Sequence, residues 1–269
     1  MQDRTLATLT VITLTLNEEH NIVPCLESVR WADELLVIDA GSSDETVELA
    51  RTFTDRVYTI TWEGYGAARN FGLAQATGEW ILWLDADERV TPVLAEEIRG
   101  ILQENAQTVD GYAVARRAYF LGRWIRHCGW YPGRVIRLFR RGKGRFNETR
   151  VHEQLFIEGR VVNTRHDMIH LTDPSLQHYM QKFNRYTSLA AIDLVASGRR
   201  FSLADLIFRP PFQFVKMYIL RRGFLDGMEG FILSVLSSAY VFTKYAKLWE
   251  SRHARHAGES PEQVSAPGS

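Results

Sequence analysis

Four short apolar segments alternate with helical patterns in the first 85 residues of the chain. The segments are rich in β-branched and large apolar residues, and they cover residues 9–16, 35–38, 57–60 and 80–84. Runs this short and this apolar are typical of strands that are buried on both faces of a sheet. Strands that alternate with helices form parallel β-α-β units with right-handed crossovers. The sequence therefore predicts an α/β fold in which a mainly parallel sheet is flanked by helices.

Acidic side chains follow three of these four predicted strands. Glu19 follows the first strand, Asp39 the second, and Asp85 and Asp87 the strand that begins at Trp80. The carboxyl ends of parallel strands meet at one edge of a sheet, where ligands bind. Asp85 and Asp87 are two residues apart, so on an extended backbone both point to one side and can hold Mg²⁺ or Mn²⁺. An isolated D-x-D pattern more often marks a solvated turn, so the neighbouring residues must decide.

Sequence motifs and composition exclude several other classes. No G-x-G-x-x-G follows the first strand and no G-x-x-x-x-G-K-[ST] occurs, so dinucleotide and P-loop sites lack their key signals. The 32 basic and 32 acidic residues balance, which gives no argument for a nucleic-acid partner. Cys25 and Cys128 lie far apart, without His or Cys at ligand spacing, which argues against a zinc site and a disulfide framework. A reducing cytoplasmic setting fits this cysteine content.

Beyond residue 105 the pattern changes to a few strands with long basic and aromatic connections. Residues 112–115 and 135–139 are predicted to be strands, and the loop between them contains Trp130. Its aromatic rings are able to stack on a sugar or to form a hydrophobic lid, and the sequence favours neither. His152 and Glu153 follow the second strand, which places a candidate base at the edge of the same cleft.

The last third of the chain is predicted to be helical. The apolar spacing over residues 174–196 indicates an amphipathic helix, and residues 201–249 are rich in apolar and basic residues. The longest apolar run, 231–243, has 13 residues, fewer than the roughly 18 to 20 that cross a bilayer. It is therefore either a core helix or a helix in the interface of an anionic membrane, and the basic residues around it favour the membrane surface. These residues are Arg209, Lys216, Arg221, Arg222, Lys244 and Lys247.

Four motifs in the first half of the chain occur in the order seen in family-2 glycosyltransferases of the GT-A fold. They are Thr15-Leu16-Asn17-Glu18-Glu19, the segment 39–46, Ala68-Arg69-Asn70 and Trp83-Leu84-Asp85-Ala86-Asp87-Glu88. The chain resembles most closely the bacterial lipopolysaccharide-core β-1,4-glucosyltransferase group, through Trp31-Ala32-Asp33-Glu34, Arg137-Leu138-Phe139-Arg140-Arg141 and Val151-His152-Glu153. The resemblance covers residues 8–155 well and the last third loosely. Ala40 departs from the Ser or Gly expected between Asp39 and Gly41.

This resemblance implies a domain organisation and a set of site residues. A GT-A domain would span residues 1–170, with a nucleotide-sugar half at about 8–105 and an acceptor half at about 106–170. A helical, membrane-associated extension would follow at 171–250 and a disordered tail at 251–269. The nucleotide sugar would contact Thr15, Asn17, Glu19, Asp39, Arg69 and Asp85, and Mg²⁺ or Mn²⁺ would bind Asp87 and Asp85. The acceptor would contact Trp130, Arg137 and Arg140. Glu153, with His152, would supply the base, and Asp87 and Glu88 remain competitors for that role.

The resemblance also implies the reaction. The leading hypothesis is inverting, metal-dependent transfer of a hexose, glucose in the closest group, from a nucleotide sugar such as UDP-glucose to a lipid-linked saccharide such as the lipopolysaccharide inner core. The enzyme would act as a peripheral protein at the cytoplasmic face of the bacterial inner membrane, and the sequence leaves its oligomeric state open. One alternative is a polyprenyl-phosphate glycosyl synthase, whose anionic acceptor would suit Arg134, Arg137, Arg140 and Arg141. Another is a non-catalytic nucleotide- or carbohydrate-binding module, against which the intact Asp85 and Asp87 argue.

Overall fold

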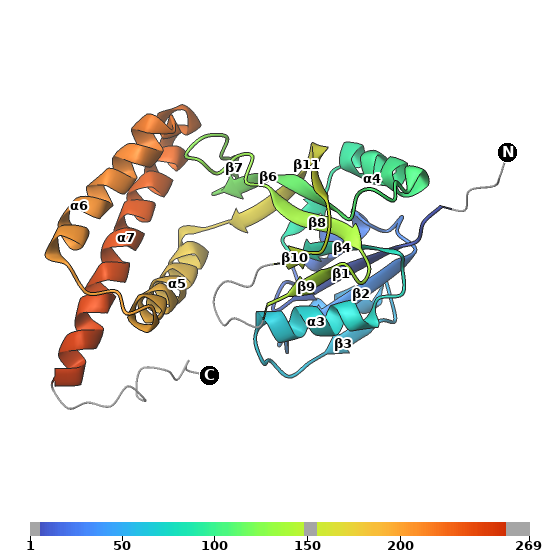
Figure 1. Ribbon diagram of the computed structural model, residues 1–269, viewed down its shortest axis with the longest axis horizontal. Helices are drawn as coiled ribbons and strands as arrows, with labels where there is room; N and C mark the ends of the chain where they lie inside the picture. The colour runs from blue at the N-terminus through green and yellow to red at the C-terminus, as the bar shows by residue number, and fades with distance from the viewer. Residues whose placement is uncertain (1–5, 148–154, 257–269) are drawn as a thin grey trace. The chain divides into compact units, whose positions relative to one another are not determined.

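The computed structural model describes residues 6–147 and 155–256, and the chain divides into two compact units. One unit comprises residues 1–119 and 130–172, and the other comprises residues 120–129 and 173–269 (Figure 1). In the described part of the first unit, residues 6–119 form helices and strands and residues 130–172 form strands, whereas the second unit is mainly helical. Each unit is described separately below.

A mixed sheet forms the centre of the first unit, in the order β3-β2-β1-β4-β8-β6-β11-β5. The parallel strands are β1 (Leu9–Thr15), β2 (Glu34–Asp39), β3 (Val57–Thr59) and β4 (Trp80–Asp85). The others are β5 (Glu88–Val90), β6 (Gly111–Phe120), β8 (Val135–Arg140) and β11 (Val161–Asp173), whereas the short strand β7 (Arg123–Trp124) belongs to the second unit. Strand β8 pairs antiparallel with β4 and β6, and β5 pairs antiparallel with β11. The predicted sheet of mixed, mainly parallel strands flanked by helices is therefore confirmed.

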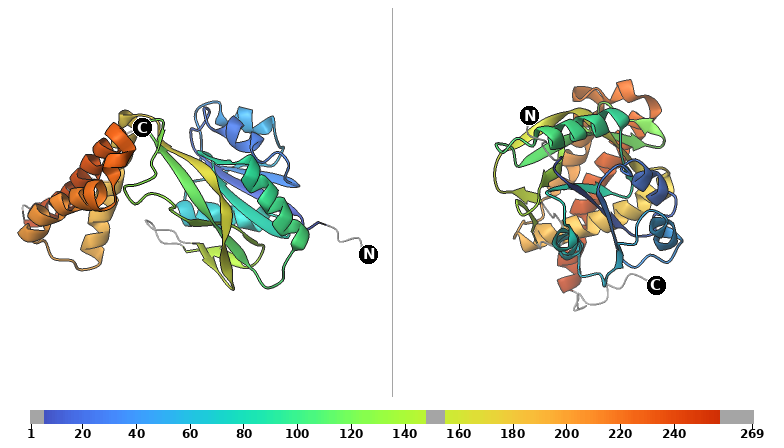
Figure 2. Two further views of the ribbon diagram at one scale, coloured as in Figure 1. Left: turned by 90° about the horizontal axis from the view of Figure 1, so that it is seen from above. Right: turned by 90° about the vertical axis from the view of Figure 1, so that its right-hand side faces the viewer.

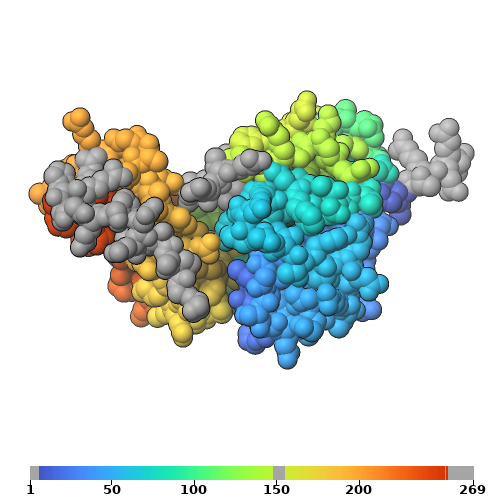
Figure 3. Space-filling view, turned by 90° about the horizontal axis from the view of Figure 1, so that it is seen from below, coloured from blue at the N-terminus to red at the C-terminus, as the bar shows by residue number. Residues whose placement is uncertain are grey.

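Alternating side chains of the central strands build separate cores on the two faces of this sheet. Val11 and Leu82 pack with the apolar side of α4 (Pro92–Glu104) in one core, and Ile12 and Trp83 pack with α3 (Tyr65–Gln75) in the other. The smaller helices α1 (Ile22–Glu27) and α2 (Thr46–Arg51) share a third cluster. Figure 2 shows the helices on both sides of the sheet, and Figure 3 shows the surface seen from the side of α3. Burial on both faces explains why these strands are almost wholly apolar.

A separate two-stranded hairpin lies against the α3 face. It consists of β9 (Gly144–Phe146) and β10 (Leu155–Ile157), paired antiparallel. Phe146 is buried and meets the Trp83 ring edge to face at a centroid distance of 5.1 Å. The Asn70 side chain donates to the Phe146 carbonyl and accepts from its N–H, both at 3.1 Å. These two bonds fix the start of the connection between β9 and β10 beside α3.

The second unit is a bundle of long helices. Its elements are α5 (Leu176–Ala196), α6 (Leu203–Phe214), the π-helix η1 (Val215–Leu220), the 3₁₀ helix η2 (Gly223–Asp226) and α7 (Gly227–His256). Helix α7 packs on both α5 and α6. The stretch 223–251 is long and apolar enough to cross a membrane by length and composition, although 22% of its most apolar window is buried in the protein. The apolar run 231–243 is shorter than the helix that contains it, because α7 continues past Lys244.

A single buried carboxylate ties residues 120–129 to this bundle. The Asp226 carboxylate accepts bonds from the backbone N–H groups of Arg126 and His127, at 3.2 and 2.8 Å, and lies 2.8 Å from His127 Nδ1. The structure groups this segment with the helices, and the acceptor half at about 106–170 stays a prediction. The contact joins residues about 100 positions apart, so no local pattern indicates it.

Candidate active site

Two loops at the carboxyl ends of β1 and β2 brace each other. The Asn17 side-chain oxygen accepts a bond from the Ser43 N–H at 2.8 Å, and the Asn17 N–H donates to Ser42 Oγ at 2.8 Å. Glu19 accepts from the Glu45 N–H at 3.3 Å, and the Glu19 N–H donates to Asp44 at 3.2 Å. The predicted nucleotide-binding residues Asn17 and Glu19 thus belong to one braced strand-end surface, and their contacts with a nucleotide stay predictions.

Asp39 and Thr15 lie deeper at the same edge. Asp39 is fully buried, and its carboxylate accepts bonds from the N–H groups of Gly41 and Ser42, each at 3.0 Å, and from the Ser42 hydroxyl. Its carboxylate therefore shapes the turn that follows β2. The Thr15 hydroxyl is buried and has no hydrogen-bond partner among the described residues. Contact of either side chain with a nucleotide remains a prediction.

Asp85 lies between two arginines. Its Oδ2 accepts a bond from Arg137 at 2.6 Å, and its Oδ1 lies 3.4 Å from the Arg69 guanidinium and accepts from Trp83 Nε1 at 3.1 Å. Burial alone raises the pKa of the Asp85 carboxyl, but Arg137 and Arg69 outweigh it and hold that pKa well below its usual range. Because both of its oxygens are engaged by cationic or N–H donors, this arrangement does not support the prediction that Asp85 is also a metal ligand.

Arg137 and Glu88 form a buried pair beneath Asp85. The Arg137 nitrogen that contacts Asp85 also lies 2.6 Å from Glu88 Oε1, and the other Glu88 oxygen accepts the Asp85 N–H at 3.1 Å. The Glu88 side chain is completely buried and that of Arg137 is 8% exposed. Burial raises the pKa of Glu88, and the charge of Arg137 opposes that rise. Arg137 thus supports Asp85 in this structure, and its contact with the acceptor stays a prediction. The buried pairing of Glu88 with Arg137 disfavours Glu88 as the base.

The structure brings Asp87 together with a residue that the sequence analysis missed. His170 Nε2 lies 3.3 Å from Asp87 Oδ2, and both side chains are partly exposed. The antiparallel pairing of β5 with β11 sets His170 opposite Glu88, and the Leu171 N–H donates to the Asp87 carbonyl at 2.9 Å. His170 occurs in no recognisable metal-ligand motif, so only this strand pairing reveals its position.

Asp87 and His170 have the donor chemistry of a shared cation site. A carboxylate oxygen and an imidazole nitrogen are both metal ligands, and Mg²⁺ is typically held by one or two carboxylates, waters and substrate phosphates. Among the residues that the structure describes, no group of three or more His, Cys, Asp or Glu side chains is placed to hold a metal. The two side chains therefore fit a cation whose remaining ligands come from a bound phosphate compound and water, and they do not form a closed structural site.

Arg69 is held in an aromatic box at the mouth of this group. Its guanidinium carbon lies 5.2 Å from the Phe146 ring centre, 5.4 Å from that of Trp83 and 5.9 Å from that of Tyr65. Cation–π contacts and the Asp85 carboxylate fix the guanidinium in one orientation. Phe146, the last residue of β9, therefore lies beside the Arg69 guanidinium.

The other residues predicted to contact the acceptor or to act as the base do not contact Asp85 or Asp87 in the described part of the structure. Arg140 lies opposite Trp80, at the far end of β4 from Asp85, and donates to the carbonyls of Val109 and Ala106. Arg140 is therefore distant from Asp85, because the length of strand β4 lies between them. Trp130 is half-buried at the start of the loop that leads to β8, and its acceptor role stays a prediction. His152 and Glu153 lie outside the described residues.

The arginines that suggested an anionic acceptor do not form one cluster. Arg134 donates to the carbonyls of Ala113 and Thr164, and Arg141 donates to the Gly78 carbonyl near the amino end of β4. Arg137 and Arg140 are bonded as described above. The residue argument for a polyprenyl-phosphate acceptor is therefore weakened.

We expect Arg137→Met to lower the free energy of unfolding by about 3–5 kcal/mol, because it leaves the buried Glu88 and Asp85 carboxylates without their shared cation. Chemical denaturation followed by circular dichroism measures this change. Arg30→Met is the matched control, because the Arg30–Glu27 pair is exposed and 3.6 Å long, and should cost less than about 1 kcal/mol. Equal effects of the two substitutions would show that the Arg137 pair does not stabilise the fold.

Comparison with known proteins gives the family of this chain. The family model "Glycosyl transferase family 2" matches residues 10–203. The chain is 34% identical to the lipopolysaccharide core biosynthesis glycosyltransferase LpsC of Rhizobium meliloti, over 93% of this chain and 94% of that protein. It is 30% identical to an uncharacterized glycosyltransferase of Rickettsia typhi, over 88% of this chain and 85% of that protein.

A solved structure is also similar to part of this chain. Glucosyl-3-phosphoglycerate synthase of Mycobacterium tuberculosis, in complex with Mn²⁺ and UDP-glucose, is 26% identical, with a TM-score of 0.36 over 41% of this chain and 44% of that one. The match with the family model and the identity to LpsC decide the class. The chain belongs to glycosyl transferase family 2, and the resemblance drawn from its motifs is confirmed.

Proposed function

We propose that this glycosyltransferase moves a hexose, with glucose as the first candidate, from a UDP-sugar to a lipid-linked saccharide of the lipopolysaccharide inner core, with inversion at the anomeric carbon. The observation that carries the donor assignment is the group of Asp85, Asp87 and His170 beside the braced loops after β1 and β2. The 34% identity to LpsC over nearly the full length of both chains supports the assignment to lipopolysaccharide core synthesis.

The charges at the site favour a diphosphate that arrives with a divalent cation. The carboxylates of Asp85 and Glu88 face the guanidiniums of Arg69, Arg116 and Arg137, and the Asp87 carboxylate faces His170. The formal charges of these three carboxylates and three guanidiniums cancel. A diphosphate adds negative charge that this balanced group does not neutralise. A divalent cation on Asp87 and His170 would restore the balance, whereas an uncharged sugar alone would need no cation.

The chain's own residues would divide the work of the transfer. Asp87 and His170 would hold Mg²⁺ or Mn²⁺, which as a Lewis acid offsets the charge that grows on the leaving nucleoside diphosphate. Asp85, fixed by Arg137, would keep the Arg69 guanidinium oriented at the donor side of the site. Glu153, with His152 beside it in the sequence, would accept the proton of the acceptor hydroxyl.

The proposed place of action is the cytoplasmic face of the inner membrane, with the protein bound peripherally. Its support is the lipid-linked acceptor implied by the relationship to LpsC and the large apolar helical unit. The acceptor is membrane-bound in this proposal, so an enzyme held at the same surface would meet it in two dimensions and would not search the whole solution volume.

The experiment that tests the donor assignment is turnover of the purified protein with a panel of nucleotide sugars. Release of the nucleoside diphosphate is measured in the presence of Mn²⁺, with and without lipopolysaccharide that lacks core hexoses as acceptor. We expect release with a UDP-hexose, stimulated by the acceptor. If the nucleoside diphosphate is released only when polyprenyl phosphate is the acceptor, the proposed saccharide acceptor is wrong. If the protein binds a nucleotide sugar but releases no nucleoside diphosphate, it is a non-catalytic module.

A further inference from the structure

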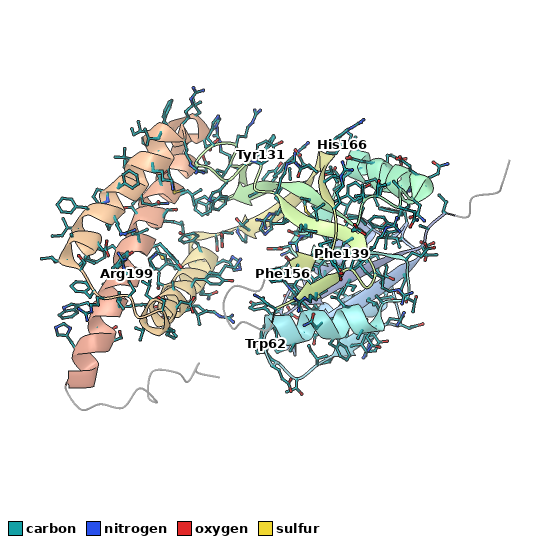
Figure 4. The ribbon with its side chains drawn as sticks, viewed as in Figure 1. Trp62, Tyr131, Phe139, Phe156, His166 and Arg199 are labelled. Carbon is teal, nitrogen blue, oxygen red and sulfur yellow. The ribbon has the colours of Figure 1, made fainter. Side chains whose placement is uncertain are left out.

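The helical unit carries a continuous apolar surface that no part of the described chain covers. We call this surface the apolar face. It is formed by α6, η1 and η2 and the first turn of α7, and its outermost side chains are Ile207, Phe208, Phe212, Leu220, Leu225 and Met228. Each of these six is at least half exposed, and Phe208 reaches 69%. In Figure 4, ring side chains stand out from α6 on the side turned away from α7. Exposed large apolar side chains that gather on neighbouring elements are typical of an interaction site.

The charges around the apolar face indicate the kind of partner. Among the described residues from 203 to 228, the exposed charged side chains are Arg209, Arg221 and Arg222. Asp205 is paired with two arginines, and Asp226 is buried. Glu229, in the first turn of α7, is partly exposed and lies 3.5 Å from Arg123. An apolar surface bordered by cations fits an anionic phospholipid bilayer. A second copy of this chain would bring like charges together at the same surface, which disfavours self-association.

The packing of α7 argues against a membrane-spanning role for this unit. The Lys247 ammonium donates to Asn184 Oδ1, Thr187 Oγ1 and Ser188 Oγ of α5, at 2.7–2.9 Å. These contacts bind the second half of α7 to a helix with a polar surface. A span over residues 223–251 would separate Lys247 from these partners or draw the polar side chains of α5 toward the bilayer.

We propose that the apolar face inserts into the acyl-chain region of one leaflet of an anionic bilayer, so that the protein is monotopic. The proposal goes beyond peripheral attachment at the proposed site of action, because it names the elements that enter lipid and makes the binding mainly hydrophobic. The arginines would lie at the level of the lipid phosphates, where they add an attraction that salt screens. Binding that persists at high ionic strength is the consequence that separates insertion from surface adsorption.

The first test compares two triple variants of the full chain in flotation with vesicles of phosphatidylglycerol and phosphatidylethanolamine at 1 M NaCl. Phe208→Ser/Phe212→Ser/Leu220→Ser removes three side chains of the apolar face. Leu176→Ser/Met180→Ser/Ile192→Ser is the matched control, because these α5 side chains are also about half exposed. We expect the wild type and the α5 variant to float, and the apolar-face variant to lose binding by about 100-fold or more. Equal binding of both variants, or no flotation of the wild type, overturns the proposal.

The second test measures how deeply the apolar face enters the bilayer. Cys25 and Cys128 are both buried, so a cysteine introduced at Leu220 is labelled selectively with a small fluorophore. We expect acyl-chain bromines to quench a label at position 220 and to leave a label at Ile192 unquenched. Absence of quenching at position 220 would contradict insertion into lipid. A dimer of the wild type that the apolar-face substitutions dissociate would show that the apolar face binds a second copy of the chain instead. Donor turnover in solution is measured on the same variants and should be unchanged, so a failure of insertion is distinguishable from a failure of the proposed activity.

Discussion

We expect Asp87→Asn to lower the rate of glycosyl transfer by about 1,000-fold or more. The substitution keeps the shape of the side chain and removes the charge of the one carboxylate in the described site that faces His170 and is not held by an arginine. Loss of a charged metal ligand costs on the order of several kcal/mol of transition-state stabilisation, and each 1.4 kcal/mol is about tenfold in rate. Excess EDTA should have the same effect on the wild type.

A readout independent of activity is the affinity for Mn²⁺, measured by electron paramagnetic resonance with and without UDP. Asp87→Asn and His170→Gln should both weaken Mn²⁺ binding. Asp85→Asn is the informative contrast, because the Asp85 oxygens are engaged by Arg137, Arg69 and Trp83. If Asp85→Asn weakens Mn²⁺ binding as much as Asp87→Asn does, or if activity survives EDTA, the assignment of the cation to Asp87 and His170 is wrong.

Glu153→Gln should reduce kcat by about 100- to 10,000-fold, the usual contribution of positioned proton transfer. The described acids leave few other candidates for the base. Glu88 is completely buried, Asp85 is held by arginines, and Asp87 faces His170. Inversion requires the acceptor oxygen to approach from the side opposite the diphosphate, so the base should come from outside the acidic strand ends.

Glu153 lies outside the described residues, and the described residues nearest to it in the sequence are Asn147 and Leu155. Glu153→Gln should leave the affinity for UDP and Mn²⁺, measured by calorimetry, nearly unchanged. A parallel fall in that affinity and in kcat would make Glu153 a donor-site or structural residue. A larger loss of kcat in His152→Gln than in Glu153→Gln would assign the base to His152.

The sequence by itself determined the parallel half of the fold and the identity of the acidic strand ends. Short apolar runs at 9–16, 35–38 and 80–84 have the period and length of buried strands, and the acidic residues that follow them share one sheet edge because parallel strands run in the same direction. The motifs around Asp39, Arg69 and Asp87 indicated the family because each motif is a short, continuous stretch of the sequence.

Only the tertiary structure decided what surrounds those acids. Arg137 reaches Asp85 across 52 positions through the pairing of β8 with β4, and His170 reaches Asp87 across more than 80 through the pairing of β11 with β5. The register of antiparallel strands places these partners, and register depends on the packing of whole sheet faces. The apolar pattern of 201–249 likewise did not show which side of α6 is covered by α7. Burial of a helix face is a property of its neighbours, so composition alone could not separate the core of this unit from the surface that we propose enters lipid.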